Sequence, residues 1–89
     1  MAHRRLRIVN VKGLHARASA RLVELVEGFD ARATVSKDGT STSGDSIMGL
    51  LMLAAGKGSE IEVETAGPQA DALAEAIAAL VADKFGEGD

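Results

Sequence analysis

The sequence contains no cysteine, no tryptophan and no tyrosine, and its 89 residues include only one proline and two phenylalanines. Without cysteine, the chain cannot form a disulfide or a thiolate metal site. It has no tyrosine or tryptophan on which the bases of single-stranded nucleic acid could stack, and its net charge of −3 gives no electrostatic reason to bind phosphate backbones. We therefore expect an aliphatic core and no nucleic-acid partner.

Long apolar segments are also missing. No stretch approaches the roughly 18 apolar residues of a membrane span, and the first ten residues, MAHRRLRIVN, lack the apolar region and cleavage site of a signal peptide. We expect a cytoplasmic protein without a membrane partner. A chain of 89 residues has the size of one small domain, so residues 1–89 are assigned to a single domain and a monomer is expected.

Three segments show the period-two alternation of strands that are buried on one face. Residues 4–11 alternate aliphatic side chains with arginines, residues 31–37 alternate small apolar side chains with polar ones, and residues 59–65 alternate aliphatic side chains with glutamates. The dipeptide Asp38-Gly39 is favoured in tight hairpin turns. A fourth, more polar strand is therefore predicted to follow it.

Three other segments favour helices. Residues 16–27 are amphipathic, and Gly28 follows them where a left-handed residue commonly ends a helix. Ser46 is a preferred N-cap in front of a short apolar helix that ends before Gly56. A third helix is predicted from residue 69 to about residue 84, because apolar residues recur there at helical spacing: Leu73, Ile77, Leu80, Val81 and Phe85.

The order of elements, β-α-β-β-α-β-α, is typical of an α+β open-faced sandwich. We expect a four-stranded, mostly antiparallel sheet covered on one face by three helices, with its other face exposed. The first two strands are joined by a helix, so they should run parallel and leave room for the last strand between them through a right-handed crossover.

His15 lies between a glycine turn and the predicted helix start, where it would be the N-cap residue. The backbone N–H groups of Ala16, Arg17 and Ala18 would then be the unpaired donors of the first turn, which is a favourable place for an anion. The Arg17 guanidinium and nearby Lys12 would add positive charge. A neutral imidazole in this setting could act as a nucleophile whose phosphorylated form is stabilised. Taken alone, the same pattern also fits a histidine that has no chemistry.

The octapeptide GLHARASA, residues 13–20, closely resembles the active-site segment G-L-H-x-R-P-A-A of the HPr family, the histidine-containing phosphocarriers of the bacterial phosphotransferase system. The resemblance extends to chain length, order of elements and a serine that opens a short apolar helix. It implies that His15 accepts a phosphoryl group on Nδ1 from phosphorylated enzyme I, which is charged by phosphoenolpyruvate, and passes it to a histidine of an enzyme IIA domain. It also implies that Arg17 lies beside the phosphoryl group.

Two departures from the family pattern stand out. Ala18 replaces the usual proline, and Lys12 stands where many members have asparagine. These departures affect the detailed geometry around His15 rather than the chemistry. No carboxylate cluster stands beside His15 in the sequence, so neither a metal nor another cofactor is expected.

Ser46 also has a regulatory interpretation. In part of the HPr family the matching serine is phosphorylated by HPr kinase/phosphorylase, and the segment SIMGLLML resembles those substrates. A phosphate there would add about two negative charges beside the docking surface. The following helix is too short to bury all its apolar side chains, so we predict a partner-binding patch made of Ile47, Met48, Leu51 and Met52, although the methionines could instead fill the core.

The alternative function is a regulatory interaction module of the same fold that signals by phosphorylation-dependent binding. A ferredoxin-like nucleic-acid or ligand-binding domain would share much of the order of elements, but it would need aromatic residues or a basic sheet face. An enzyme that acts without partner proteins is not expected, because a single histidine with no evident general base or substrate pocket cannot complete a catalytic cycle. The sequence leaves open whether the pathway serves sugar uptake or a nitrogen-related regulatory branch.

Overall fold

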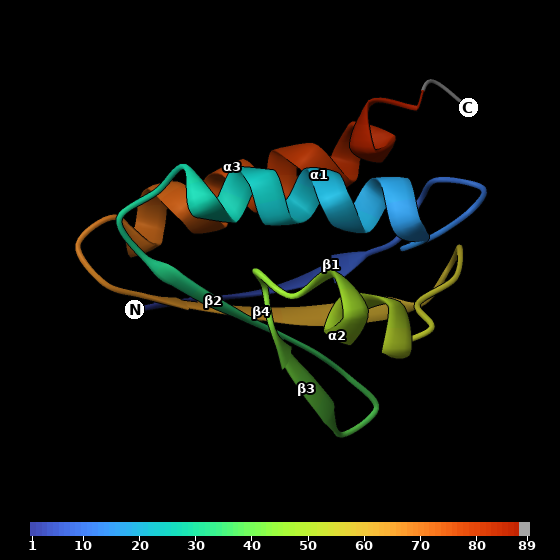
Figure 1. The fold of residues 1–89 in the computed structure, drawn as a ribbon, viewed down its shortest axis with the longest axis horizontal. Helices are drawn as coiled ribbons and strands as arrows, with labels where there is room; N and C mark the ends of the chain where they lie inside the picture. The colour runs from blue at the N-terminus through green and yellow to red at the C-terminus, as the bar shows by residue number, and fades with distance from the viewer. Residues whose placement is uncertain (88–89) are drawn as a thin grey trace.

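The computed structural model describes residues 1–87 as a sheet with helices on one side (Figure 1). The elements follow the order β-α-β-β-α-β-α predicted from the sequence, and a short 3₁₀ turn, η1, comes after them. Their bounds are β1 (Ala2–Arg7), α1 (Ala16–Glu27), β2 (Arg32–Lys37), β3 (Thr40–Ser43), α2 (Ile47–Met52), β4 (Glu60–Ala66), α3 (Ala70–Ala82) and η1 (Lys84–Gly86).

The four strands form one sheet in the order β1-β4-β2-β3, and every neighbouring pair is antiparallel. β4 therefore lies between β1 and β2, which run parallel to each other as predicted. The hairpin between β2 and β3 turns at Asp38 and Gly39, whose φ angles are 49° and 85°. Positive φ at both central residues is what a two-residue hairpin turn of type I′ requires.

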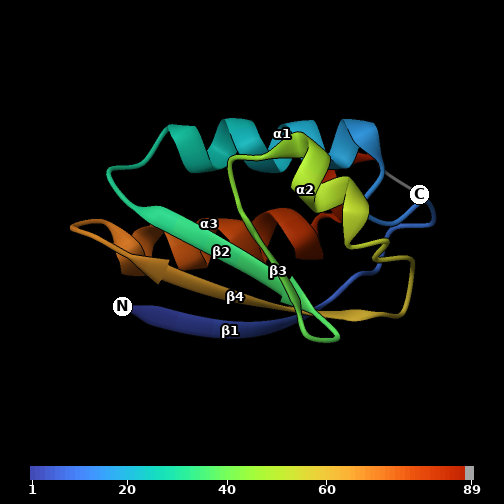
Figure 2. The same cartoon turned by 60° about the horizontal axis from the view of Figure 1, so that its bottom comes forward.

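Helices α1 and α3 lie side by side over one face of the sheet, and α2 packs against α1 and β3 (Figures 1 and 2). The core between these layers is aliphatic apart from Phe85. Along β4, Ile61, Val63 and Thr65 are buried, whereas Glu60 and Glu64 on the other face are exposed. This alternation confirms the predicted sandwich with one open face.

The structure corrects three details. Gly28 ends α1 with a right-handed φ of −81°, so it is not the predicted left-handed residue; its N–H instead bonds the carbonyl of Leu25, which closes the last turn. The first strand ends at Arg7, and the fully buried Ile8 already belongs to the next loop. The last helix ends at Ala82, and Phe85 enters the core from η1.

Within residues 1–87, no helix is both long enough and apolar enough to cross a membrane. The longest helix, α3, has 13 residues.

Candidate functional site

The loop that leads to His15 is fixed against the segment between α2 and β4. Gly13 has a φ of 66°, and a Cβ atom there would lie 2.5 Å from the carbonyl oxygen of Ala55 and 2.7 Å from Cα of Gly56. The next residue, Leu14, donates its backbone N–H to the same Ala55 carbonyl at 2.8 Å. Glycine is required here both for the backbone angle and for the close approach.

His15 is the N-cap residue of α1, as predicted. Its backbone is extended, and its side chain makes no capping hydrogen bond. Helical hydrogen bonding begins with the N–H of Ser19, which donates to the His15 carbonyl at 2.8 Å. The N–H groups of Ala16, Arg17 and Ala18 precede this bond at the start of the helix. Those of the exposed residues Ala16 and Arg17 can serve an anion, whereas Ala18, which was also predicted to bind the phosphate, is fully buried and does not present its N–H at the surface.

Two basic residues share a hollow of about 220 Å³ with His15 and Glu87: Lys12 from the loop and Arg17 from the first turn of α1. The structure thus brings together the three residues that the sequence marked as an anion site. Arg17 is exposed and the His15 side chain retains 27% of its exposure, so an incoming group can reach both. Ala18 differs from these residues, because it is fully buried beneath them.

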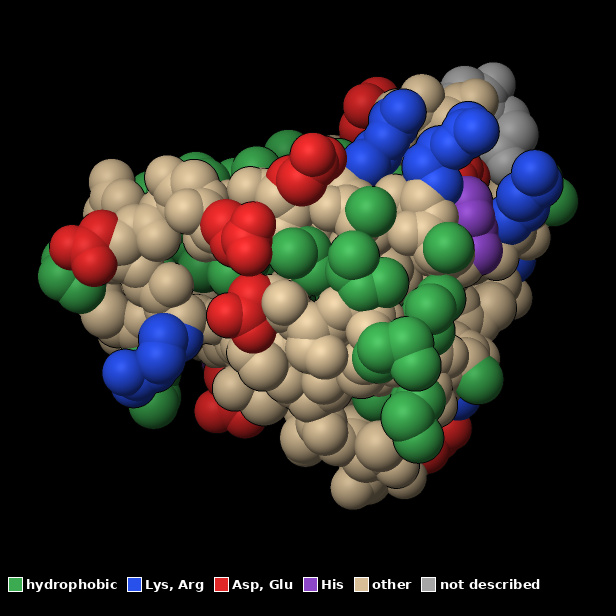
Figure 3. Space-filling model, in the orientation of Figure 1, with side chains coloured by type: hydrophobic (Ala, Val, Ile, Leu, Met, Phe, Trp, Pro, Cys, Tyr) green, Lys and Arg blue, Asp and Glu red, His purple; other side chains and the backbone are tan. Residues whose placement is uncertain are grey.

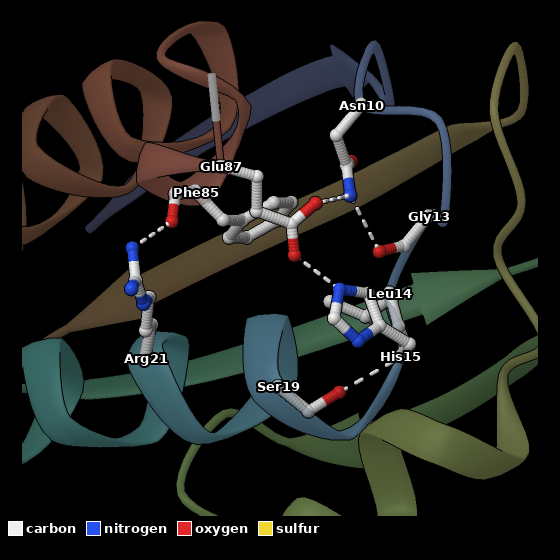
Figure 4. A network of polar contacts seen from close by, with 8 residues as sticks. All are labelled: Asn10, Gly13, Leu14, His15, Ser19, Arg21, Phe85 and Glu87. Atoms are coloured by element: carbon white, nitrogen blue, oxygen red, sulfur yellow. Dashed lines mark hydrogen bonds and ion pairs between the residues drawn. The ribbon is translucent and has the colours of Figure 1, made fainter. Parts of the chain in front are cut away.

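Glu87 belongs to this site and was not anticipated from the sequence. One carboxylate oxygen is in close contact with Nε2 of His15, and the other accepts a hydrogen bond from Nδ2 of Asn10 at 2.9 Å (Figure 4). Asn10 is fully buried and also donates from Nδ2 to the Gly13 carbonyl at 2.8 Å. The loop, the start of α1 and the end of the chain are therefore joined through one carboxylate.

The turn η1 places Glu87 over the site. Lys84, Phe85 and Gly86 have φ angles of 57°, 55° and 76°. Such angles cost on the order of 1–3 kcal/mol for a non-glycine residue. Complete burial of the Phe85 side chain offsets part of this cost, since burying a phenylalanine stabilises by about 1.5–3 kcal/mol. Arg21 of α1 also donates to the Phe85 carbonyl, which fastens the turn to the helix.

Ser46 is the N-cap of α2, as predicted, and its hydroxyl oxygen accepts the N–H of Gly49 at 3.1 Å. The structure also explains the glycine inside this helix. A Cβ atom on Gly49 would lie 1.8 Å from Oγ1 of Thr42, so its absence lets α2 approach β3 closely.

The apolar side chains of α2 are divided between core and surface. Leu50 is fully buried, whereas Met48 and Met52 keep 70% and 77% of their exposure and do not fill the core. Figure 3 shows hydrophobic side chains gathered over α2, below the histidine and basic side chains at the start of α1. Four residues form this α2 patch: Ile47, Met48, Leu51 and Met52.

The α2 patch adjoins the site, because Leu51 and His15 line a second hollow of about 280 Å³. The remaining lining comes from the loop around Lys12 and from the segment after α2. A partner that reaches His15 would therefore also meet an apolar surface. Among residues 1–87, no group of three or more histidine, aspartate or glutamate side chains is arranged to hold a metal ion.

Comparison with known proteins shows the family of the chain. A family model described as the PTS HPr component phosphorylation site matches residues 2–83. The chain belongs to the HPr family. Phosphocarriers of this family serve the phosphotransferase system. His15, Arg17 and Ser46 lie within the matched residues, whereas Glu87 lies outside them.

Two curated members of the HPr family show how far the likeness extends. The phosphocarrier protein HPr of Cupriavidus necator is 45% identical over 89 residues, which cover both chains completely. The phosphocarrier protein NPr of Escherichia coli K12 is 43% identical over 81 residues, or 90% of each chain. Among solved structures, HPr from Thermoanaerobacter tengcongensis has a TM-score of 0.93 at 31% identity and covers 98% of both chains.

Proposed function

We propose that His15 accepts a phosphoryl group on Nδ1 from phosphorylated enzyme I and passes it to a histidine of an enzyme IIA domain. The observation that carries this proposal is the shared hollow of His15, Lys12 and Arg17 at the open end of α1. A phosphoryl group on the imidazole would meet two cations and unpaired backbone donors there. Phosphoryl transfer needs little more from a carrier than such positioning and charge stabilisation.

The donor and acceptor proteins supply the rest of the chemistry, so the carrier works as a substrate of each partner rather than as an enzyme. The α2 patch supports this role, because it is exposed beside the hollow that contains His15. Its two methionines have flexible side chains that can adapt to partners of different shape. We assign the patch to the docking of enzyme I and enzyme IIA. A monomer in the cytoplasm, where phosphoenolpyruvate is made, suits this exchange of partners.

Ser46 is proposed as a second, regulatory phosphorylation site for HPr kinase/phosphorylase. Its side chain is half-buried at the start of α2 and precedes the α2 patch directly. A phosphate on Oγ would place about two negative charges at the edge of the docking surface. Modification at Ser46 would therefore weaken docking without touching His15.

The transfer assignment is tested by incubating the protein with phosphoenolpyruvate and enzyme I and measuring its mass. The wild type should gain the mass of one phosphoryl group, and mild acid should remove it. The chain's other histidine gives a matched control, because His3 lies in β1 at the open face of the sheet. His3→Ala should still be phosphorylated, whereas His15→Ala should not. An acid-labile phosphoryl group on His15→Ala would refute the assignment.

A further inference from the structure

The carboxylate of Glu87 makes a contact with His15 that the proposed transfer reaction has not yet used. It meets Nε2 of the imidazole with one oxygen and Nδ2 of Asn10 with the other. The Glu87 side chain is only 10% exposed, so water competes little for these contacts. Asn10 is itself fully buried, which fixes the direction from which the carboxylate approaches.

The contact with Glu87 decides which nitrogen of the His15 ring carries the proton. A carboxylate offers only acceptors, so Nε2 must be the protonated nitrogen. Nδ1 then has a free lone pair, and in Figure 4 it points away from Glu87. Across residues 1–87, no hydrogen bond to Nδ1 is found, and the side chain does not cap its own helix. The ring is thus held with its nucleophilic nitrogen toward the open side.

We propose that Glu87 is a positioning residue that keeps His15 in the Nε2–H tautomer and offsets the charge of its phosphorylated form. This inference rests on the proposed function. When the Nδ1 lone pair attacks phosphorus, the Nδ1–P bond forms as the bond from phosphorus to the donor atom breaks and its electron pair leaves with the donor. The proton stays on Nε2, and the ring becomes positive beside the carboxylate.

The reverse step needs no proton transfer either. When an acceptor takes the phosphoryl group, the Nδ1–P bond breaks, its electron pair returns to Nδ1, and the ring is neutral again. Glu87 therefore does for this histidine what the buried aspartate does in a Ser-His-Asp triad, where it orients the imidazole and stabilises its cation. The fastened turn η1 is what brings this group across 72 positions of sequence.

Replacement by glutamine tests the tautomer directly. In Glu87→Gln, Asn10 Nδ2 still needs an acceptor, so the amide oxygen should face Asn10 and the amide N–H₂ should face His15. A donor at that position favours a lone pair on Nε2 and moves the proton to Nδ1. The ¹⁵N signals of the His15 ring, recorded on labelled protein with any tag at the N-terminus, should show Nε2–H in the wild type and mainly Nδ1–H in Glu87→Gln.

The matched control is Glu64→Gln, which makes the same change of charge on the open face of the sheet. Glu87→Ala serves as a second variant, because it removes the carboxylate without adding a donor and should give a mixture of tautomers. Ring signals of Glu87→Gln and Glu87→Ala that match those of Glu64→Gln would overturn the proposal. This measurement needs no partner protein, so it remains decisive even if the wild type fails to accept a phosphoryl group.

Kinetics provide the second readout. At metal sites, removing a carboxylate that orients a ligating histidine typically costs about 10–100-fold in metal affinity or activity, and we take the same range for His15. We expect Glu87→Gln to lower kcat for its phosphorylation by enzyme I within that range. The KM of enzyme I for this protein should stay unchanged, because the Glu87 side chain is nearly buried. Glu87→Asp should recover part of the loss. Transfer by Glu87→Gln at or above the rate of Glu64→Gln would contradict the positioning role and identify the carboxylate as inert or inhibitory.

Discussion

The starts of α1 and α2 use their N-cap residues in opposite ways. In α2, the Ser46 side chain turns back on its own helix and accepts the N–H of Gly49, the third helical residue. In α1, the His15 side chain turns away toward Glu87 and leaves the N–H of Ala18, the corresponding third residue, ahead of the first helical hydrogen bond. One cap completes its helix, and the other leaves the helix open.

The two caps differ in function: the Ser46 cap stabilises its helix, whereas the His15 cap leaves backbone donors for a ligand. A hydroxyl that satisfies a backbone donor stabilises its helix by about 0.5–2 kcal/mol. A histidine that leaves the donors of the first turn unpaired gives up that stability, and the exposed donors on Ala16 and Arg17 stay available to a ligand. The basic side chains around His15 belong to the same arrangement, since a ligand on the open end of α1 also meets Lys12 and Arg17.

The largest effect is expected from reversing the charge at the open cap. In Arg17→Glu, a carboxylate would replace the guanidinium beside the phosphoryl group, and loss of one such stabilising group commonly costs about 100–1,000-fold in rate. The rate of phosphorylation by enzyme I measures this effect. Arg32→Glu is the control, because Arg32 is also exposed but lies at the start of β2, beyond the opposite end of α1. Equal rates for the two variants would remove Arg17 from the site.

The two caps should also differ in their contribution to stability. Ser46→Ala removes the acceptor of the Gly49 N–H and should lower the free energy of unfolding by about 1 kcal/mol. His15→Ala removes no capping bond, so in the Glu87→Ala background, where the contact with Nε2 is already absent, it should change this free energy by less than about 0.5 kcal/mol. Urea denaturation of each variant beside its own parent protein measures the difference. A larger loss for His15→Ala would contradict the division of roles, because it would make His15 a structural cap.

The smallest effect is expected from placing proline at the third residue of each helix, Ala18 in α1 and Gly49 in α2. Because the N–H of Ala18 precedes the helical hydrogen bonds of α1, proline there should cost no bond. Ala18→Pro should raise the free energy of unfolding by roughly 0.4–1 kcal/mol, because proline restricts the unfolded chain. Gly49→Pro, at the equivalent position of α2, should destabilise, since it removes a bonded N–H and adds atoms against Thr42.

Denaturant midpoints at one pH decide this prediction. A lower midpoint for Ala18→Pro would mean that the N–H of Ala18 is bonded, that its backbone does not suit proline, or that its buried site has no room for the ring. Only the first of these results would move the open end of α1 away from His15.

Sequence patterns predicted most of the fold because the segments of the sandwich carry simple periodicities. The alternation around Ile61 and Val63 identified β4, and the helical spacing after Gly13 placed His15 at the start of α1. The Ser46 cap was equally readable, because capping depends on residues that are neighbours in sequence. Within the site, Lys12 and Arg17 could be assigned to the surroundings of His15 because both are basic and both lie within three residues of it in the sequence.

The parts that were missed depend on long-range contacts. Phe85 has helical spacing from Val81, so periodicity grouped it with the last helix, which was predicted to end at about residue 84, whereas its ring packs into the core from a turn with positive φ. Glu87 stands 72 positions from His15, and nothing local distinguishes it from a glutamate in solvent. Gly28 is a different case, because the miss there is local: composition suggested a left-handed ending, but the Gly28 N–H bonds the Leu25 carbonyl with right-handed backbone angles.

The sheet order sets when the site can exist during synthesis of the protein. β1 and β2 leave the ribosome before β4, which must later occupy the gap between them. The segment that holds the His15 loop, through Ala55, immediately precedes β4, and Glu87 comes after α3. A nascent chain therefore carries its histidine early but completes the surroundings of that histidine last. Its competence as a phosphoryl acceptor would mark the end of folding, so partner proteins would meet no half-built carrier.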